Sequence, residues 1–223
     1  MRHGHLQSDP ALSIERKTVA PKPPPRQRVL SDGEIRALWL DFGDGHVSKT
    51  LWLALKLLLA TSQRRGEVMR AKRAEFDMRK QYWLIPAERL GKKKGPNGAM
   101  PHLVPRSPLA LSVVKELLEL AAESEWLLPS PDDPKRPMDE RALNRAISRK
   151  SFGWSRHDVR RTVRTRLSGL GVAAVVAERV IGHELLGLIA VYDVHAYETE
   201  KRAALRLWAN ELKRILKEQA GRQ

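Results

Sequence analysis

Residues 155–183 read SRHDVRRTVRTRLSGLGVAAVVAERVIGH, and the interpretation of the whole chain starts from this stretch. Its first half predicts a basic helix on which His157 and Arg160 lie one turn apart, because side chains three residues apart are neighbours on a helix face. Its second half predicts a helix that ends at Gly182, a residue type common after the last turn, with His183 next. Taken alone, these residues are also typical of ordinary helix ends.

Further candidate residues lie upstream and downstream of this stretch. Upstream, Arg64 and Glu67 lie one turn apart in the segment TSQRRGE of residues 61–67, a spacing most often found as a surface ion pair. Downstream, Tyr192 follows His183 by nine residues. A tyrosine is usually a half-buried packing residue. Only the order of all these residues along the chain favours a common site.

The charge of the chain favours a polyanionic partner. Lys and Arg total 41 against 26 Asp and Glu, which gives a formal charge of +15. Between Arg141 and Arg166 there are nine basic residues and one acid, Asp158. A run of charge is more often a solvated surface, but clustered basic side chains neutralise phosphates and release their counterions. Because this run coincides with the helix of His157 and Arg160, we expect nucleic acid.

Composition excludes several classes of protein. The chain has no cysteine, which rules out disulfides and thiolate chemistry. The most apolar stretch, Leu51 to Ala60, contains Lys56 and is too short to span a bilayer. Residues 1–10 lack the apolar stretch of a signal peptide. We therefore expect a cytoplasmic protein with no membrane partner.

The predicted fold is mainly α with a small antiparallel β-sheet (α+β). Helical periodicity or capping signals predict helices from Leu30, over 48–61, from Ser107, over 138–150 and beyond Tyr192. Residues 74–104 predict instead a β-hairpin and a third short strand with a lysine-rich tip.

We expect one folded domain over residues 29–219, preceded by a linker or arm over 1–28 and followed by a tail over 220–223. The run of prolines from Pro21 to Pro25 favours an extended segment in the linker.

The order of motifs resembles the catalytic domain of the tyrosine recombinases, or phage integrases. It runs T-x-x-R-x-x-E at 61–67, a basic hairpin, H-x-x-R at 157–160, G-H at 182–183, then Tyr192. The resemblance covers about Arg28 to Leu212. The block AVYDVHAYETEKRAAL of residues 190–205 is most similar to integrases of satellite phages and genomic islands.

The resemblance implies a role for each candidate. Tyr192 is the nucleophile, Arg64 and Arg160 clamp the phosphate, His157 accepts a proton, His183 hydrogen-bonds the phosphate and Lys92 protonates the leaving group. Glu67 orients an arginine, and Arg156, Arg161, Lys93 and Lys94 bind DNA. These residue types suit phosphoryl transfer, since guanidiniums fork onto phosphate oxygens and a tyrosine of pKa near ~10 needs activation.

The implied reaction uses no cofactor and no metal: Tyr192 forms a 3′-phosphotyrosyl link, which a 5′ hydroxyl of a partner strand then reverses. The implied partner is double-stranded DNA at attachment sites, bound by a tetramer with host DNA-bending and directionality proteins at the nucleoid. Full-length relatives carry N-terminal DNA-binding regions, so residues 1–28 are expected to be the remnant of one. A fragment of this kind would bind DNA weakly.

Several alternatives stay open. Lys94 competes with Lys92 as the proton donor, Arg65 with Arg64, and Tyr197 with Tyr192. The chain could also be a type IB topoisomerase-like relaxing enzyme, because that class shares the tyrosine chemistry, or a non-catalytic basic DNA-binding module. The other arginines of the helix, Arg164 and Arg166, are expected to contact the DNA backbone or solvent.

Overall fold

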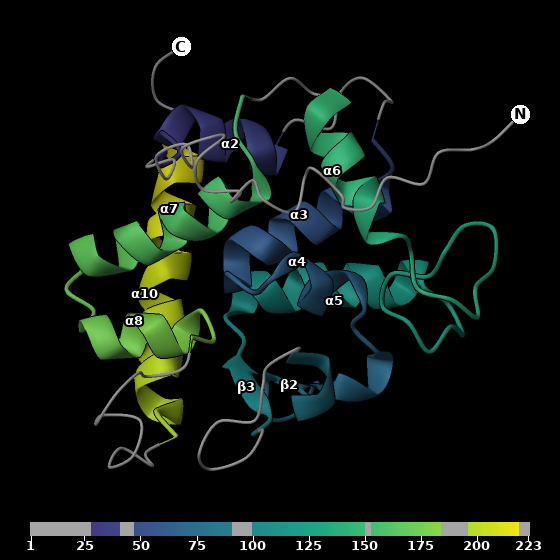
Figure 1. Ribbon diagram of the computed structural model, residues 1–223. Helices are drawn as coiled ribbons and strands as arrows, with labels where there is room; N and C mark the ends of the chain where they lie inside the picture. The colour runs from purple at the N-terminus through teal and green to yellow at the C-terminus, as the bar shows by residue number, and fades with distance from the viewer. Residues whose placement is uncertain (1–27, 41–46, 91–99, 150–152, 184–195, 219–223) are drawn as a thin grey trace, which may run out of the picture.

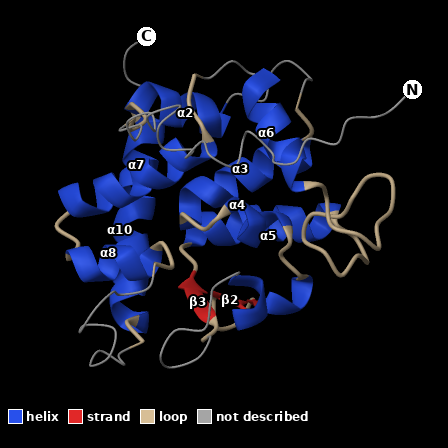
Figure 2. Ribbon diagram, in the orientation of Figure 1, coloured by secondary structure: helices blue, strands red, loops and turns tan. Residues whose placement is uncertain are grey.

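The computed structural model describes residues 28–40, 47–90, 100–149, 153–183 and 196–218, and helices dominate them around one small sheet (Figures 1 and 2). The helices are α2 (Asp32–Leu40), α3 (Lys49–Thr61), α4 (Arg65–Met69), α5 (Pro108–Leu120), α6 (Glu140–Arg149), α7 (Arg156–Gly169), α8 (Ala174–Val180) and α10 (Glu198–Lys217). The predicted fold class is confirmed. The domain boundaries stay a prediction.

Helix starts follow the capping signals in the sequence. At α2, the Glu34 carboxylate accepts from the Ser31 backbone N–H at 2.9 Å, and the Glu34 N–H donates to the Ser31 hydroxyl at 3.2 Å. At α7, Asp158 accepts from the Ser155 N–H at 2.8 Å in the same reciprocal pattern. Such a box satisfies backbone donors that a helix start leaves without partners. It therefore determines where α7, the helix of His157 and Arg160, begins.

The sheet is a three-stranded antiparallel meander of β1 (Phe76–Asp77), β2 (Tyr82–Ile85) and β3 (His102–Pro105). Trp83 pairs with Phe76 on one side and with Val104 on the other. Single 3₁₀ turns flank it, η2 (Arg73–Glu75) before β1 and η3 (Ala87–Leu90) after β2. The predicted hairpin and third strand are thus confirmed, and the sheet lies at one end of the helical body (Figure 2).

The core forms around α3, which is buried along most of its length. It packs against α5, α6, α7 and α10. Trp52 of α3, Trp83 of β2 and Trp208 of α10 are each fully buried. The Trp208 indole N–H donates to the Leu59 carbonyl at 2.8 Å, so a buried polar group is satisfied where α10 crosses α3.

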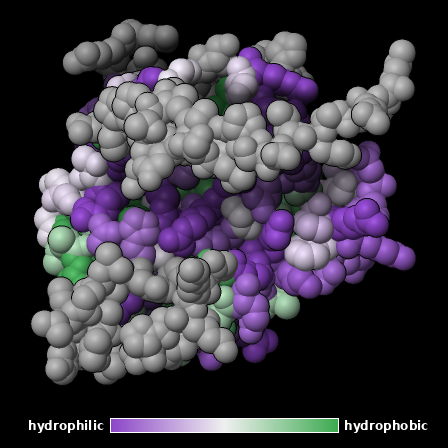
Figure 3. Space-filling model, viewed as in Figure 1, coloured by the Kyte–Doolittle hydropathy of each residue, from purple (hydrophilic) through white to green (hydrophobic). Residues whose placement is uncertain are grey.

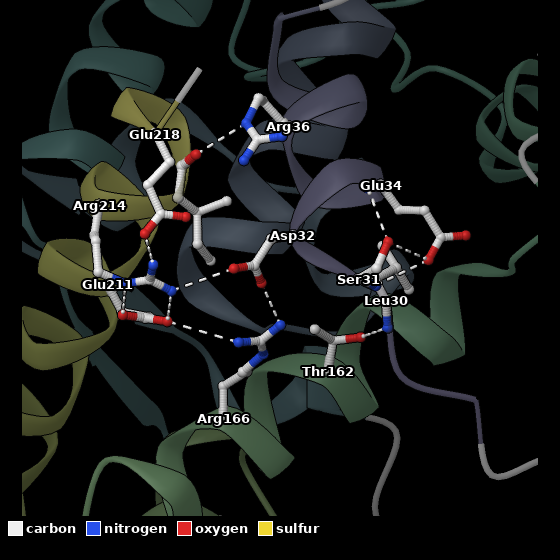
Figure 4. Close-up of polar contacts among 11 residues, drawn as sticks. Leu30, Ser31, Asp32, Glu34, Arg36, Thr162, Arg166, Glu211, Arg214 and Glu218 are labelled. Carbon is white, nitrogen blue, oxygen red and sulfur yellow. Dashed lines mark hydrogen bonds and ion pairs between the residues drawn. The ribbon is translucent and has the colours of Figure 1, made fainter. Parts of the chain in front are cut away.

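The end of α10 is held by its own chain through a network of charges (Figure 4). Arg166 of α7 and Arg214 of α10 both contact Asp32 of α2, at 2.5 and 3.3 Å. Glu211 bridges the same two arginines at 3.6 and 2.7 Å. The described part of α10 therefore packs in cis. Among the described residues, no helix has the length and apolar character needed to cross a membrane.

Candidate active site

Arg160 reaches from α7 to the ends of two other helices. Its guanidinium donates to the Ser62 carbonyl at 2.6 Å and to the Ile181 carbonyl. Ser62 closes α3 in the left-handed conformation, with φ of +58°. A guanidinium carries five N–H donors, so these two bonds leave others for an anion.

Arg64 approaches the same place from the start of α4. One nitrogen of its guanidinium donates to the Gly182 carbonyl at 3.2 Å, and the other donates to the Glu67 carboxylate at 2.9 Å. The second oxygen of Glu67 accepts from the Arg64 backbone N–H at 2.6 Å. Glu67 is only 3% exposed. This buried carboxylate therefore holds the backbone and the side chain of Arg64 together, as an orienting role requires.

The two arginines meet at consecutive carbonyls, those of Ile181 and Gly182, directly before His183. Burial and the neighbouring charge of Arg64 together lower the pKa of Arg160 to about 10, against the opposing effect of the Glu67 and Glu178 carboxylates. Arg160 still carries its charge at neutral pH. Two like charges held close together favour an anion between them, because it relieves their repulsion.

Gly182 is required where the chain turns into His183. Its φ is +65°, a region that residues with a Cβ rarely adopt. A Cβ on Gly182 would also lie 3.2 Å from Nε2 of His102, a residue of β3. The turn at Gly182 therefore lies close to β3, the strand that follows the predicted lysine-rich tip.

His183 is held by Glu178, a residue of α8 five positions before it. The Nδ1 atom of His183 lies 2.6 Å from a Glu178 carboxylate oxygen, and the His183 backbone N–H donates to the Glu178 carbonyl at 2.9 Å. The His183 side chain is 46% exposed. It can therefore meet a ligand from solvent.

His157 lies on α7 one turn before Arg160 and is exposed. Desolvation by its neighbours lowers the pKa of His157, and the charges of Arg156 and Arg160 lower it further, although part of the side chain faces solvent. A histidine with a pKa below its usual value is neutral at pH 7. It is therefore in the form that accepts a proton.

The two arginines predicted to bind DNA, Arg156 and Arg161, have different partners within the chain. Arg156 donates to the Asn144 side chain at 3.1 Å, and Arg161 pairs with Asp158 at 3.1 Å. Burial lowers the pKa of Arg156, and the nearby charge of Arg65 adds to the effect, so two cations lie close together at the start of α7. Figure 3 shows hydrophilic residues across the face where α4 and α7 lie.

Arg164 and Arg166 differ from expectation. Arg164 pairs with Glu178 at 2.7 Å, and Arg166 pairs with Asp32 and Glu211. Both arginines are therefore committed to ion pairs within the chain rather than to solvent.

Tyr192, Lys92, Lys93 and Lys94 lie outside the described residues. The rival tyrosine, Tyr197, lies at the start of α10 with φ of +52°, and it packs against the hydrophobic core. The Arg179 guanidinium lies 5.7 Å from the centre of its ring. This position fits a packing residue.

The rival arginine is also accounted for. Arg65 pairs with Glu140 of α6 at 3.0 Å, whereas Arg64 points to Gly182. Of the two, the structure brings Arg64 to Arg160.

Sequence reasoning missed the partners that hold the site residues. These are the carbonyls of Ser62 and Ile181, the carboxylate of Glu178, and Gln63, whose buried amide donates to the Val180 carbonyl at 3.0 Å. Carbonyl acceptors leave no signal in a sequence, because every residue has one. Glu178 left none either, because it lies five residues before His183 and only residues three or four apart are neighbours on a helix face.

Comparisons with known proteins identify relatives of the chain. The family model described as the phage integrase family matches residues 30–199. The integrase of Enterobacteria phage P4 is 28% identical over 173 residues, which are 72% of this chain and 39% of that protein.

Among solved structures, an integrase from mycobacterium phage Brujita has a TM-score of 0.62 at 15% identity and covers 96% of this chain and 70% of its own. The Tn1549 transposon integrase in complex with transposon right end DNA has a TM-score of 0.58 at 15% identity, covering 94% of this chain and 72% of its own. The fold is thus shared with these proteins.

Proposed function

The chain belongs to the phage integrase family, and we propose that it is the catalytic domain of a site-specific DNA recombinase. It cleaves and rejoins DNA through a 3′-phosphotyrosyl intermediate. The observation that carries this proposal is the convergence of Arg64 and Arg160 on the carbonyls directly before His183. Donors arranged in advance around a developing negative charge are the main means of catalysing phosphoryl transfer.

The proposed reaction assigns a proton path. The Tyr192 hydroxyl attacks phosphorus and gives its proton to His157, while the bond from phosphorus to the 5′ oxygen breaks. Lys92 protonates that oxygen. Arg64, Arg160 and His183 hold the non-bridging oxygens, and Glu67 holds Arg64 in place. A 5′ hydroxyl of a partner strand then reverses these steps and releases Tyr192.

The lowered pKa of His157 supports its role as proton acceptor, because a base must be neutral at the working pH. The reaction draws its charge stabilisation from guanidiniums, and we propose that it proceeds without a metal ion.

We propose double-stranded DNA at attachment sites as the substrate, and the charge of +15 supports this. The chain spans about two fifths of the length of the phage P4 integrase. Choice of site and assembly are therefore proposals about the whole protein. We propose that it acts as a tetramer on two sites and works with host DNA-bending and directionality proteins at the nucleoid. Within this chain, the proposed contacts to the DNA backbone are Arg156, Arg161, Lys93 and Lys94.

A covalent adduct tests the proposal. The chain is incubated with a pool of duplexes nicked at varied positions, so that cleavage near a nick releases a short 5′-hydroxyl fragment and traps the enzyme. A denaturing gel should show an adduct for the wild type and for Tyr197→Phe, and none for Tyr192→Phe. EDTA should leave its amount unchanged.

Three results would contradict this proposal. The first is the absence of an adduct from the wild type, and the second is an adduct that survives in Tyr192→Phe. The third is strong relaxation of supercoiled DNA without dependence on site, which would favour a topoisomerase.

A further inference from the structure

Three side chains form a row that ends at His183. The Nδ1 atom of His183 contacts one carboxylate oxygen of Glu178 at 2.6 Å, and the Arg164 Nε–H donates to the other oxygen at 2.7 Å. Arg164 is itself held by the Ser168 hydroxyl at 2.6 Å. The row therefore runs from Arg164 in the second half of α7, through Glu178 of α8, to the candidate phosphate site.

Glu178 is held as a carboxylate in this row. Burial alone would raise its pKa, but the hydrogen bonds from Arg164 and His183 outweigh it and bring the pKa below its usual value. Its charge also acts on Arg160, the buried arginine of the site. The side chain of Glu178 is 34% exposed, against 24% for Arg164. Glu178 is therefore a partly exposed carboxylate beside the site, with both oxygens engaged.

We propose that Glu178 is a positioning residue for the phosphate site: it binds Nδ1 of His183 and so sets the direction in which Nε2–H, when protonated, donates to a phosphate oxygen. The role assigned to His183 rests on the function proposed above. Arg164 completes the arrangement by holding the carboxylate in place.

The physical basis is the two-sided chemistry of imidazole. A carboxylate at Nδ1 keeps the proton on that nitrogen and sets the rotation of the ring. When Nε2 is protonated as well, the ring donates from both edges. Glu178 and the phosphate then balance its positive charge from opposite sides. Without Glu178 the neutral ring can place its proton on Nε2, but nothing then fixes the direction in which Nε2–H donates, and no carboxylate balances the positive charge of the doubly protonated ring.

The first test needs no DNA and no activity. Long-range ¹H–¹⁵N spectra of histidine-labelled protein distinguish the two neutral tautomers, and a His183→Gln variant identifies the signals of His183. The wild type should hold the proton of the neutral ring on Nδ1. Glu178→Ala should shift the ring toward the Nε2–H tautomer, while the signals of the other histidines stay in place. An unchanged tautomer in Glu178→Ala would overturn the proposal.

The second test measures the rate of adduct formation at saturating DNA. Glu178→Ala should slow it by about tenfold, the smaller end of the effect seen when a partner that orients a histidine at a metal site is removed. DNA affinity should change little. Glu178→Gln keeps the size of the side chain but offers only one oxygen, so its rate of adduct formation should lie between those of the wild type and Glu178→Ala. Equal rates for the wild type and Glu178→Ala would contradict the catalytic part.

Glu211→Ala is the matched control. It also removes a helical carboxylate that bridges two groups, Arg166 and Arg214, but it touches no histidine among the described residues. It should change neither the tautomer nor the rate. If the wild type forms no adduct, the proposed function fails while the spectra still decide the role of Glu178. If the adduct forms and the tautomer does not respond, only this inference fails.

Discussion

Gly182 illustrates how one residue constrains the site. It adopts a left-handed backbone, leaves open the space beside the His102 ring that a Cβ would enter, and offers its carbonyl to Arg64. A side chain at this position would disturb all three features at once. The glycine in the G-H motif is therefore explained by geometry as well as by resemblance.

We expect Gly182→Ala to destabilise the protein by about 1–2 kcal/mol from the left-handed backbone alone, with a further cost from the contact with His102. Gly169 is the matched control, because it lies in α7 and a Cβ there would meet nothing within 4 Å. Gly169→Ala should be neutral or stabilising by about 0.4–1 kcal/mol. Denaturant unfolding measures both, and equal stability of Gly182→Ala and the wild type would contradict the argument.

At the scale of elements, Lys201 joins α10 to β3. It is 6% exposed, and its ammonium donates to the Leu103 carbonyl at 2.8 Å. Burial lowers its pKa from 10.5 to about 8, while Glu198 opposes the shift and Arg179 adds to it. A buried charge at this joint is costly at neutral pH.

Stability should therefore depend on pH through Lys201. Between about pH 8 and 10.5 the unfolded chain binds more protons at this residue than the folded protein does, so its destabilising effect fades as pH rises. The melting temperature of Lys201→Met relative to wild type should be highest below pH 8 and should fall toward pH 10.5. Lys213→Met, at an exposed position of the same helix, controls for the change of charge. A difference that stays constant with pH would refute the role of Lys201.

The helices and strands were predicted well from the sequence, whereas the contacts between residues far apart in the chain were not. Serine caps, apolar spacing and the polar turn after Asp77 give the helices and the sheet, because these signals are local. The approach of Arg160 to Ser62 and Ile181 joins residues 98 and 21 positions apart. No local pattern encodes such a meeting, and the order of motifs indicated it only through the family resemblance.

At the scale of the whole molecule, the basic residues differ in availability. Arg214 contacts Asp32, Glu211 and Glu218, whereas the described polar partner of Arg156 is the neutral Asn144. Net charge attracts DNA, but a cation surrounded by three carboxylates gains less from a phosphate than one whose described partner is neutral. The start of α7 is therefore a better candidate DNA contact than the end of α10.

Salt dependence of DNA binding tests this assignment. Arg156→Ala should weaken binding and should reduce the slope of log affinity against log salt by about 1, as expected for one lost phosphate contact. Arg214→Ala removes the same charge but should leave the slope unchanged. Fluorescence anisotropy over a range of salt concentrations gives both slopes, and a larger change for Arg214→Ala would reverse the assignment.

The anchors of the two site arginines have a consequence for evolution. Ser62, Ile181 and Gly182 contribute carbonyl groups, which a substitution cannot delete. Drift at Ser62 or Ile181 can therefore replace the side chain and leave the acceptor in place, provided that the backbone keeps its path. Selection for the placement of Arg64 and Arg160 therefore acts on the backbone conformation at Ser62 and Ile181, and it leaves the side chains at these two positions open to variation.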